Sequence, residues 1–368
     1  MSESIKYLPV DILQQFMQDV FIGLGVPSEE AAISAQILIQ SDLFGIESHG
    51  VGRLKMYYDR IKNGQHLPKT HFEIVKEAPA TAVVDGHHGV GMVIGYKAMN
   101  LAIEKARVYG MGSVAVRDST HFGIDGYYPL MAARAGMIGM SFTNARPSIA
   151  PTFGVQPMLG TNPIAFGCPT DEANPFLYDA ATSITQRGKF ETLERKGLPG
   201  KAGWVTDQQG EFLTDSSAIL KGLTQNTAAL LPLGGAGEDL GGHKGYGLAT
   251  IVEIFSASLQ TGAFLQALTG NTPDGGKTHF RIGHFFMAIN VESFTDLDTF
   301  KKTTGDILRE LRASQKAPGQ ARIYTAGEKE FEKEIEVRKT GVAIVPKLQE
   351  NLRIMRDELG LTQYHFDF

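Results

Sequence analysis

The sequence contains little that would suit an extracellular, membrane or nucleic-acid-binding protein. Cys168 is its single cysteine in 368 residues, which excludes an internal disulfide and indicates a reducing compartment. Basic residues are not in excess, because 35 Lys and Arg face 40 Asp and Glu for a net charge of −5. A protein that holds a phosphate backbone would be basic, so we expect no nucleic-acid partner.

Membrane and export signals are also missing. No run of 18 uncharged apolar residues occurs, so no membrane span is expected. The N-terminus, MSESIKYLPVDILQQFMQDV, has no charged segment leading into an apolar one and does not read as a signal peptide. We therefore expect a cytoplasmic protein.

Several catalytic motifs are absent as well. There is no H-E-x-x-H and no C-x-x-C, and the adjacent His87 and His88 would point to different faces of a strand, so no metal site is expected. Lys244 is followed by Gly245 instead of Ser or Thr, which argues against a Walker A loop and ATP chemistry. Without G-x-S-x-G, a Ser-His-Asp hydrolase has no support either.

The patterns that are present predict an α/β protein with helical ends. Apolar residues recur at helical spacing in both terminal regions, while short β-branched runs alternate with helical segments between them. A length of 368 residues favours two domains. The expected helices are 8–24, 28–44, 51–62, 91–109, 124–135, 245–259, 297–314, 328–338 and 345–358, and the expected strands are 81–86, 112–118, 136–144, 162–169, 176–183 and 284–291.

One glycine-rich turn imitates a dinucleotide fingerprint. Gly89, Gly91 and Gly95 follow a predicted strand and open a helix, and Asp118 ends the next strand, where a ribose-binding acid would stand. However, the spacing is G-x-G-x-x-x-G instead of G-x-G-x-x-G, so the third glycine arrives one residue too late for close packing of helix and strand. A Rossmann site here is the less favoured interpretation.

The segment SDLFGIESHGVGRLKMYYDR contains the strongest chemical pattern. His49 and Arg53 are four residues apart, which would place them on one face of a helix, and Tyr57 extends that face. Arginine can bind a carboxylate through two hydrogen bonds, and histidine can exchange a proton with a neighbouring carbonyl oxygen. Gly50 and Gly52 would let a ligand approach the backbone. A surface His beside a surface Arg remains the alternative.

Other segments could bind a cofactor. His121 lies in the loop after the strand 112–118, and ligands gather at the carboxyl ends of strands in α/β sheets; a histidine that merely closes the loop is the alternative. The strand that ends in Asp179, Thr182 and Ser183 offers hydroxyls, with N-capping as the alternative. Lys244 follows a glycine-rich loop at the start of a helix, where a phosphate would bind.

Taken together, these segments resemble a known family. The chain carries, in order, SDLFGIESHGVGRLKMYYDRIKNG, DSTHFG, MSFTN, LGTNPIAFGCP, DAATS, RGK, LPLGG, HKGYGLA and APGQARIYTAGE. This succession is similar to that of the malate/L-lactate dehydrogenase type 2 family, also called the sulfolactate dehydrogenase-like reductases, which includes ureidoglycolate dehydrogenase and diketogulonate reductase. The resemblance extends over nearly the whole chain.

The resemblance implies a non-Rossmann, mixed-sheet α/β domain (residues 76–299) and a helical domain formed from both termini (residues 1–75 with 300–368). It also implies a homodimer that binds NAD or NADP in a cleft near the subunit interface. The implied cofactor residues are His121, Asp179, Ala180, Ala181, Thr182, Ser183, Lys244, Gly245, Gly327, Glu328 and Lys329.

For the chemistry, the resemblance implies an NAD(P)-dependent dehydrogenase that interconverts a 2-hydroxy acid and a 2-oxo acid. His49 or His121 would be the acid/base, and Ser48, Arg53 and Tyr57 would contact the substrate. Malate or lactate is the default substrate; the alternatives are another 2-oxo acid, a cyclic imino acid, or a non-catalytic binding role. The sequence reads Asn144-Ala145-Arg146-Pro147 where the family commonly has N-T-S-P, so Arg146 is a further candidate contact for a second carboxylate or a cofactor phosphate.

Overall fold

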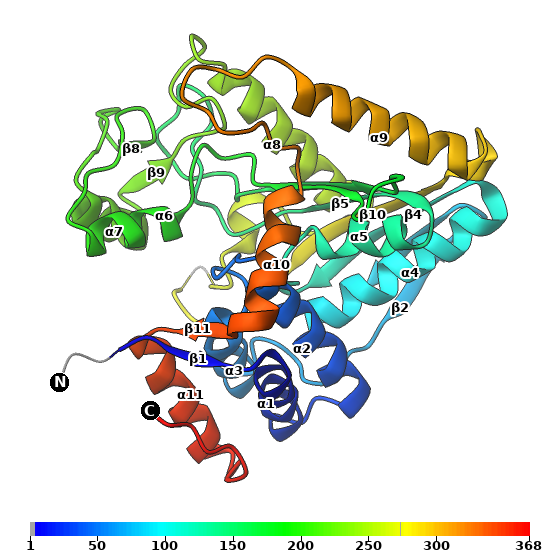
Figure 1. Ribbon diagram of the computed structural model, residues 1–368. Coiled ribbons are helices and arrows are strands. Elements are labelled where there is room, and N and C mark those ends of the chain that lie inside the picture. Colours follow the sequence, from blue (N-terminus) through cyan, green and yellow to red (C-terminus); the bar gives the residue numbers. More distant parts are fainter. Residues whose placement is uncertain (1–3, 273) are drawn as a thin grey trace.

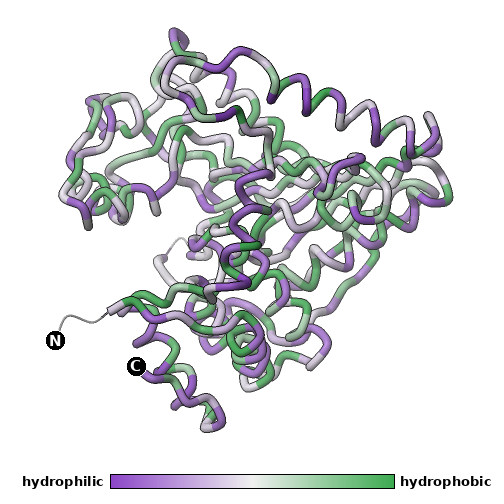
Figure 2. Tube along the Cα trace, viewed as in Figure 1, coloured by the Kyte–Doolittle hydropathy of each residue, from purple (hydrophilic) through white to green (hydrophobic). Residues whose placement is uncertain are grey.

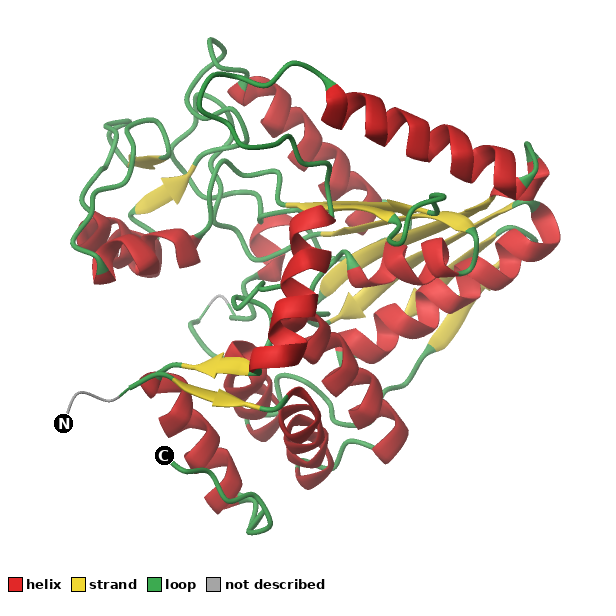
Figure 3. Cartoon of the chain, in the orientation of Figure 1, coloured by secondary structure: helices red, strands yellow, loops and turns green. Residues whose placement is uncertain are grey.

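The computed structural model, which describes residues 4–272 and 274–368, contains a central seven-stranded sheet (Figures 1 and 3). The strand order is β2-β3-β4-β10-β5-β6-β7; β3 and β4 run parallel, and the other neighbours run antiparallel. A Rossmann sheet is mostly parallel, so this sheet, with helices around it, confirms the expected non-Rossmann, mixed-sheet α/β fold. The bounds are β2 (Glu73–Glu77), β3 (Thr81–Asp85), β4 (Met111–Ser119), β5 (Met137–Thr143), β6 (Ile164–Cys168), β7 (Phe176–Ala180) and β10 (Ile282–Asn290).

Alternating side chains of β10 pack against two layers of helices. Phe286 belongs to the large apolar core on the side of α4 (Gly91–Tyr109) and α5 (Tyr127–Arg134). Phe285 packs with Phe142 and Val252 on the side of α8 (Gly242–Ala257). Because successive strand residues point to opposite faces, helices cover this strand on both sides.

The glycines of the apparent dinucleotide fingerprint are packing positions. A Cβ on Gly91 would collide with the carbonyl oxygens of Thr120 and His121, and one on Gly95 would lie 2.7 Å from the Tyr128 ring. The carboxylate of Asp118, the apparent ribose-binding acid, lies 2.6 Å from Nε of Arg281. These contacts agree with the rejection of a Rossmann site at this turn.

Both ends of the chain contribute to a single group of helices. β1 (Lys6–Leu8) pairs antiparallel with β11 (Val342–Ile344), which brings the terminal regions side by side (Figure 1). Phe16 packs edge-on against Tyr364 and Phe366 from the other end of the chain. The helices are α1 (Val10–Gly23), α2 (Ser28–Leu43), α3 (Leu54–Lys62), α10 (Glu328–Thr340) and α11 (Pro346–Glu358).

The remaining elements lie beyond the sheet. A smaller apolar cluster (Phe190, Val205, Ile219 and Leu230) joins α6 (Arg187–Arg195), α7 (Ser216–Gln225), β8 (Val205–Asp207) and β9 (Ala228–Leu230). Helix α9 (Leu297–Ala313) lies on the same side of the sheet as α8 in Figure 1. Its Arg309 forms an ion pair at 2.9 Å with Asp171, which lies between β6 and β7. The division into residues 1–75 with 300–368 and residues 76–299 stays a prediction.

Hydropathy follows this arrangement. In Figure 2 hydrophobic residues are frequent along the central strands, whereas hydrophilic residues are frequent along α10 and α11. Across the part of the chain that the structure describes, no helix combines the length and the apolar character needed to cross a membrane.

Candidate active site

The ends of three central strands are joined by the buried imidazole of His284, on β10. Its Nδ1 lies 2.8 Å from Oγ1 of Thr143 at the end of β5, and its Nε2 lies 2.8 Å from Oγ of Ser119 at the end of β4. The ring also stacks on Phe122, with centroids 4.3 Å apart. Burial lowers the pKa of His284 to about 3, so the ring is neutral and one nitrogen donates while the other accepts.

The residues that follow these strand ends line a cleft. His121 comes two residues after Ser119, and Asn144 follows Thr143 directly. The cleft, as the term is used below, is the hollow lined by His49, His121, Asp125, Asn144, Asp179 and Ala181 together with their neighbours. Two histidines predicted from separate segments thus meet in one site, with ring centroids 5.6 Å apart.

His49 does not lie in a helix, contrary to the expectation from its spacing with Arg53. A helix is expected over 51–62, but the segment begins with the 3-10 turn η1 (Val51–Arg53), and α3 starts only at Leu54. Instead of lying one helical turn from His49 on a shared face, Arg53 folds back, and its Nε donates to the carbonyl oxygen of Ser48 at 2.5 Å. The Oγ of Ser48 lies 2.8 Å from Nδ1 of His49 and holds that ring.

The glycines beside His49 lie close to other protein atoms; that they also let a ligand approach the backbone stays a prediction. A Cβ on Gly50 would collide with the carboxylate of Asp42, and one on Gly52 would lie 3.0 Å from the carbonyl oxygen of Glu47. Asp42 is buried and accepts the backbone N–H of Val51 at 2.8 Å. Burial raises the pKa of Asp42 to about 8, with a further contribution from the charge of Glu47.

His121 is held by two groups at one ring nitrogen. The hydroxyl of Tyr57 lies 2.5 Å from its Nδ1, and the backbone N–H of Gly123 donates to the same nitrogen at 3.3 Å. Because Nδ1 accepts from Gly123, the neutral ring carries its proton on Nε2. Tyr57 is fully buried. Its hydroxyl contacts His121, and its side chain is not part of the cleft lining.

Both histidines are neutral in the free protein. Burial lowers the pKa of His49 from 6.5 to about 4, and the positive charge of Arg53 lowers it further. Burial also lowers the pKa of His121 well below its usual value, and the positive charges of Arg53 and Arg60 act in the same direction. A pKa shifted by burial and nearby charges is typical of functional sites.

Two residues near the site were missed from the sequence. Arg60 lies one turn after Tyr57 on α3, and its guanidinium lies 4.2 Å from the ring centre of Phe280. Burial lowers the pKa of Arg60 to about 10, and the charges of Arg146 and Arg53 also lower it. His66 is buried between Tyr57 and Phe280, and neither ring nitrogen has a hydrogen-bond partner among the described residues. Arg60 could have been found by extending the helical spacing of Arg53 and Tyr57.

We call Arg53, Arg60 and Arg146 the arginine group. The charges of Arg53 and Arg146 both act on Arg60, and Arg146 lines a separate hollow directly after Ala145, which lines the cleft. No ion pair joins any of the three to a carboxylate within residues 4–272 and 274–368. The site therefore carries unpaired positive charge.

The predicted cofactor residues fall into three places. Asp179, Ala180 and Ala181 line the cleft, and a second hollow that shares Asp179 continues to Gly327 and Lys329. Lys244 and Gly245 line a different hollow at the start of α8.

Three other predicted cofactor residues are engaged within the protein. Thr182 donates its hydroxyl to the carbonyl oxygen of Asn162 at 2.9 Å, and Ser183 donates to that of Thr185 at 2.8 Å. Glu328 pairs with Arg312 and Arg322 between α9 and α10. Their side chains thus bond protein groups in this structure, and their contact with a cofactor stays a prediction.

The cleft fits a nicotinamide cofactor. Oδ2 of Asp125 is buried at the cleft and has no hydrogen-bond partner among the described residues. Burial and the charge of Asp179 raise the pKa of Asp125 well above its usual value, which favours the protonated form, and a protonated carboxyl can donate a hydrogen bond to an amide oxygen. A buried polar atom without a partner is uncommon and calls for a ligand or water.

The whole fold is that of known dehydrogenases. The chain superposes with a TM-score of 0.94 on malate dehydrogenase from Entamoeba histolytica, which is 43% identical in sequence, with 99% of this chain and 100% of that chain covered. Sulfolactate dehydrogenase from Methanocaldococcus jannaschii gives a TM-score of 0.87 at 36% identity, covering 98% and 99%.

The family follows from the sequence match. A model described as malate/L-lactate dehydrogenase matches residues 8–353, and the chain belongs to this family. It is 45% identical over 360 residues to malate dehydrogenase from Pyrococcus abyssi, covering 98% of this chain and 96% of that protein. The chain is thus an enzyme, an oxidoreductase of 2-hydroxy acids, and its family implies a nicotinamide cofactor.

The buried carboxyl of Asp42 generates a prediction about stability and pH. Its pKa is raised from 3.8 to about 8 in the folded protein, so folding retains a proton that the unfolded chain releases, and stability falls as pH rises between these values. Asp42→Asn keeps an acceptor for Val51 and removes this titration. We expect its stability relative to wild type to increase from pH 5 to pH 8, by at most about 1.4 kcal/mol per pH unit.

Urea unfolding at a series of pH values measures this difference. The exposed Asp11→Asn variant on α1 controls for the loss of a carboxyl. A difference between Asp42→Asn and wild type that stays constant across this range would contradict the prediction.

Proposed function

We propose that this enzyme interconverts a 2-hydroxy acid and a 2-oxo acid that carry a second acidic group, with malate and oxaloacetate as the first candidates, using NAD or NADP. The observation that carries the proposal is the arginine group beside two neutral histidines. Three guanidinium groups without carboxylate partners repel one another, and a dianion would relieve this repulsion.

The relatives support a dianionic substrate over lactate. The similar proteins named above are malate and sulfolactate dehydrogenases, and both of these substrates carry a second acidic group next to the 2-hydroxy acid. Lactate carries one carboxylate and would leave more of the arginine charge uncompensated. Arg53 is expected to bind the carboxylate next to the reacting carbon, with Ser48 close by, and Arg60 or Arg146 the second acidic group.

The two histidines are proposed to have different roles. His121 carries its neutral-state proton on Nε2, so it can donate a hydrogen bond to the oxygen of a 2-oxo acid. His49 is held at Nδ1 by Ser48 alone, and its unprotonated ring can accept the hydroxyl proton of the 2-hydroxy acid. The negative charge of the bound substrate raises the pKa of a neighbouring imidazole, which allows His49 to return that proton in the reverse direction.

The cofactor is proposed to extend from the cleft along both neighbouring hollows. Asp125 and Asp179 to Ala181 would hold the nicotinamide end, and Gly327 and Lys329, or Lys244 and Gly245, would bind the phosphates or the far end. When bound, the nicotinamide supplies a hydride acceptor or donor. Arg146, Arg187 and Lys189 are our candidates to bind the 2′-phosphate that distinguishes NADP from NAD.

A homodimer is part of the same proposal. An apolar stripe is exposed on α8 and on the turn that follows it; the exposed fractions are 38% for Leu248, 47% for Ile251 and 53% for Ile254 on the helix, and 55% for Leu259 in the turn. Four large apolar side chains in one stripe are typical of a contact with another protein. Lys244 and Leu248 line the same hollow, so a second subunit on this stripe would place the interface next to predicted cofactor residues.

A cytoplasmic location also belongs to the proposal. It is supported by the single cysteine, Cys168, which is a buried free thiol and is therefore compatible with a reducing compartment.

The first test is a panel of 2-oxo acids assayed with NADH and with NADPH at the absorbance band of the reduced nicotinamide. We expect oxaloacetate to exceed pyruvate in kcat/KM. His49→Ala should lower kcat by about 10²–10⁴-fold, while cofactor binding, measured by fluorescence titration, is retained. If neither His49→Ala nor His121→Ala lowers kcat, the proposed mechanism is wrong; preference for pyruvate or a cyclic imino acid would overturn the substrate class.

The second test addresses the recognition of the distal acidic group. Arg60→Gln or Arg146→Ala should lower kcat/KM for oxaloacetate by about 10–100-fold, the loss of one charged hydrogen bond, and change that for pyruvate far less. The exposed Arg107→Gln variant on α4 is the control. Unchanged constants for oxaloacetate and for both cofactors in Arg146→Ala would exclude Arg146, and equal losses for both acids in Arg60→Gln would exclude a distal role for Arg60.

The third test measures the molecular mass in solution by size-exclusion chromatography with light scattering. Wild type is expected to have the mass of a dimer, and the double variant Ile251→Glu with Ile254→Glu that of a monomer, because the stripe then carries charges that an interface would bury. Ile12→Glu, at an exposed position of α1, should remain dimeric. A monomeric wild type, or a double variant with an unchanged mass, would refute the proposed interface.

A further inference from the structure

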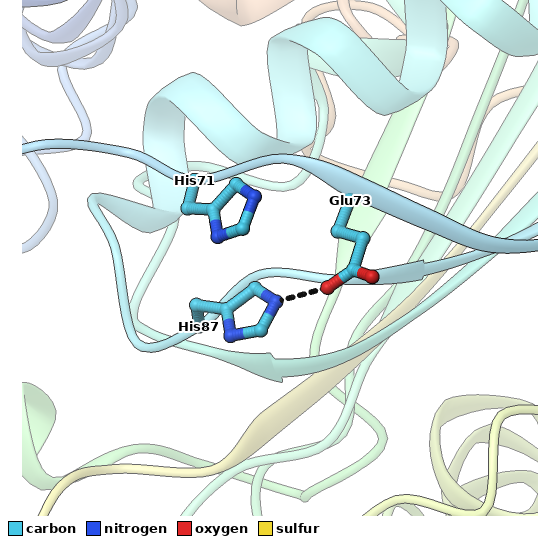
Figure 4. A group of neighbouring side chains, drawn as sticks. All are labelled: His71, Glu73 and His87. Carbon is cyan, nitrogen blue, oxygen red and sulfur yellow. Dashed lines mark hydrogen bonds and ion pairs between the residues drawn. The ribbon is translucent and has the colours of Figure 1, made fainter.

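Two histidines and a glutamate come together at the edge of the sheet, outside the cleft (Figure 4). His71 precedes β2, Glu73 is the first residue of β2, and His87 follows β3. One ligand atom from each side chain lies within 4.8 Å of the other two. Nε2 of His87 is 2.6 Å from the Glu73 carboxylate, and the two imidazoles stack with centroids 4.4 Å apart.

The backbone holds His87 in place for this cluster. Its φ of 45° lies in the left-handed region, which is uncommon for a residue with a side chain. The N–H of His87 donates to Oδ1 of Asp85 at 2.9 Å, and Oδ2 of the same carboxylate lies 2.9 Å from Nε of Arg117. Asp85 is thus fixed by two partners and in turn fixes the turn that carries His87.

We propose that His71, Glu73 and His87 bind a divalent transition-metal ion of the zinc type. Two imidazole nitrogens and one carboxylate oxygen are a common ligand set for Zn²⁺, with the fourth tetrahedral position left to water. Ca²⁺ and Mg²⁺ prefer oxygen ligands and do not suit this set. Bond lengths of about 2.0–2.1 Å place tetrahedral ligand atoms about 3.4 Å apart, so the three side chains need to close only slightly.

The side chains are free to make this adjustment. His71 and Glu73 are exposed, and His87 is half-buried. One imidazole comes from the segment before β2 and the other from the segment after β3, and Figure 4 shows both beside the Glu73 side chain. In the absence of metal the Glu73–His87 contact already holds two of the three ligands together.

Adjacent histidines in the sequence obscured this site. The expectation of no metal site considered His87 with His88, and these two do diverge: Nδ1 of His88 lies 3.0 Å from the carbonyl oxygen of Phe280, and its ring stacks on His279 at 4.5 Å. His87 meets residues from the neighbouring strand instead. The three ligands do not line the cleft, so the metal would tie the segment after α3 to the turn before α4 and would not take part in the chemistry.

Titration of the metal-free full-length protein with Zn²⁺, followed by calorimetry, and with Co²⁺, followed by visible absorption, tests the proposal. We expect one ion per chain, a tetrahedral Co²⁺ spectrum and a higher melting temperature with metal, because a ligand of the folded state stabilises it. His71→Ala, Glu73→Gln and His87→Asn should each weaken binding by at least about tenfold. Asn tolerates positive φ, so His87→Asn preserves the turn.

His365→Ala removes an exposed histidine near the C-terminus and should bind metal as wild type does. No binding by wild type, or binding by the three variants as strong as that of His365→Ala, overturns the proposal. The melting temperature of each variant without metal separates loss of a ligand from loss of the fold, since a correctly folded variant keeps the metal-free value of wild type. None of these readouts depends on the oxidoreductase activity.

Discussion

The imidazole of His284 joins β4, β5 and β10 at the point where each strand meets the cleft. Both of its nitrogens are bonded to hydroxyls of neighbouring strands, so the spacing of the three strand ends is set by one neutral ring. His121 and Asn144 follow these ends within two residues. The position of a proposed catalytic group therefore depends on a histidine that does not itself line the cleft.

A second buried polar group holds the adjacent wall. Glu253, on α8, accepts from Nδ2 of Asn162 at 2.8 Å, from the backbone of Leu265 at 3.0 Å and from Nδ2 of Asn144 at 3.4 Å. Buried hydrogen bonds of this kind specify one arrangement more sharply than apolar contacts do. The inner face of α8 thus orders the loops of the cleft, while its outer face carries the apolar stripe, so one helix connects the site to the proposed interface.

How much the sequence could reveal depended on whether a feature was local. Long periodic segments such as 91–109 and 297–314 were predicted close to their observed bounds, because the pattern lies within the element. The strands β1 and β11 were missed, since three residues become a strand only through a partner more than 330 positions away. In the site, His49 and His121 were predicted from the sequence. The need for glycine at position 50 was not, because it arises from the Asp42 carboxylate, which a Cβ at this position would strike.

Charge connects substrate recognition with proton exchange in this site. Besides burial, Arg53 lowers the pKa of both histidines and Arg60 lowers that of His121, so the free enzyme holds two neutral bases beside uncompensated positive charge. A carboxylate bound by Arg53 would offset a charge that lowers the pKa of both imidazoles, and a second acidic group at Arg60 would offset a further charge that acts on His121. A second acidic group on the substrate would therefore do more than increase affinity: at Arg60 it would also bring the pKa of His121 closer to its usual value.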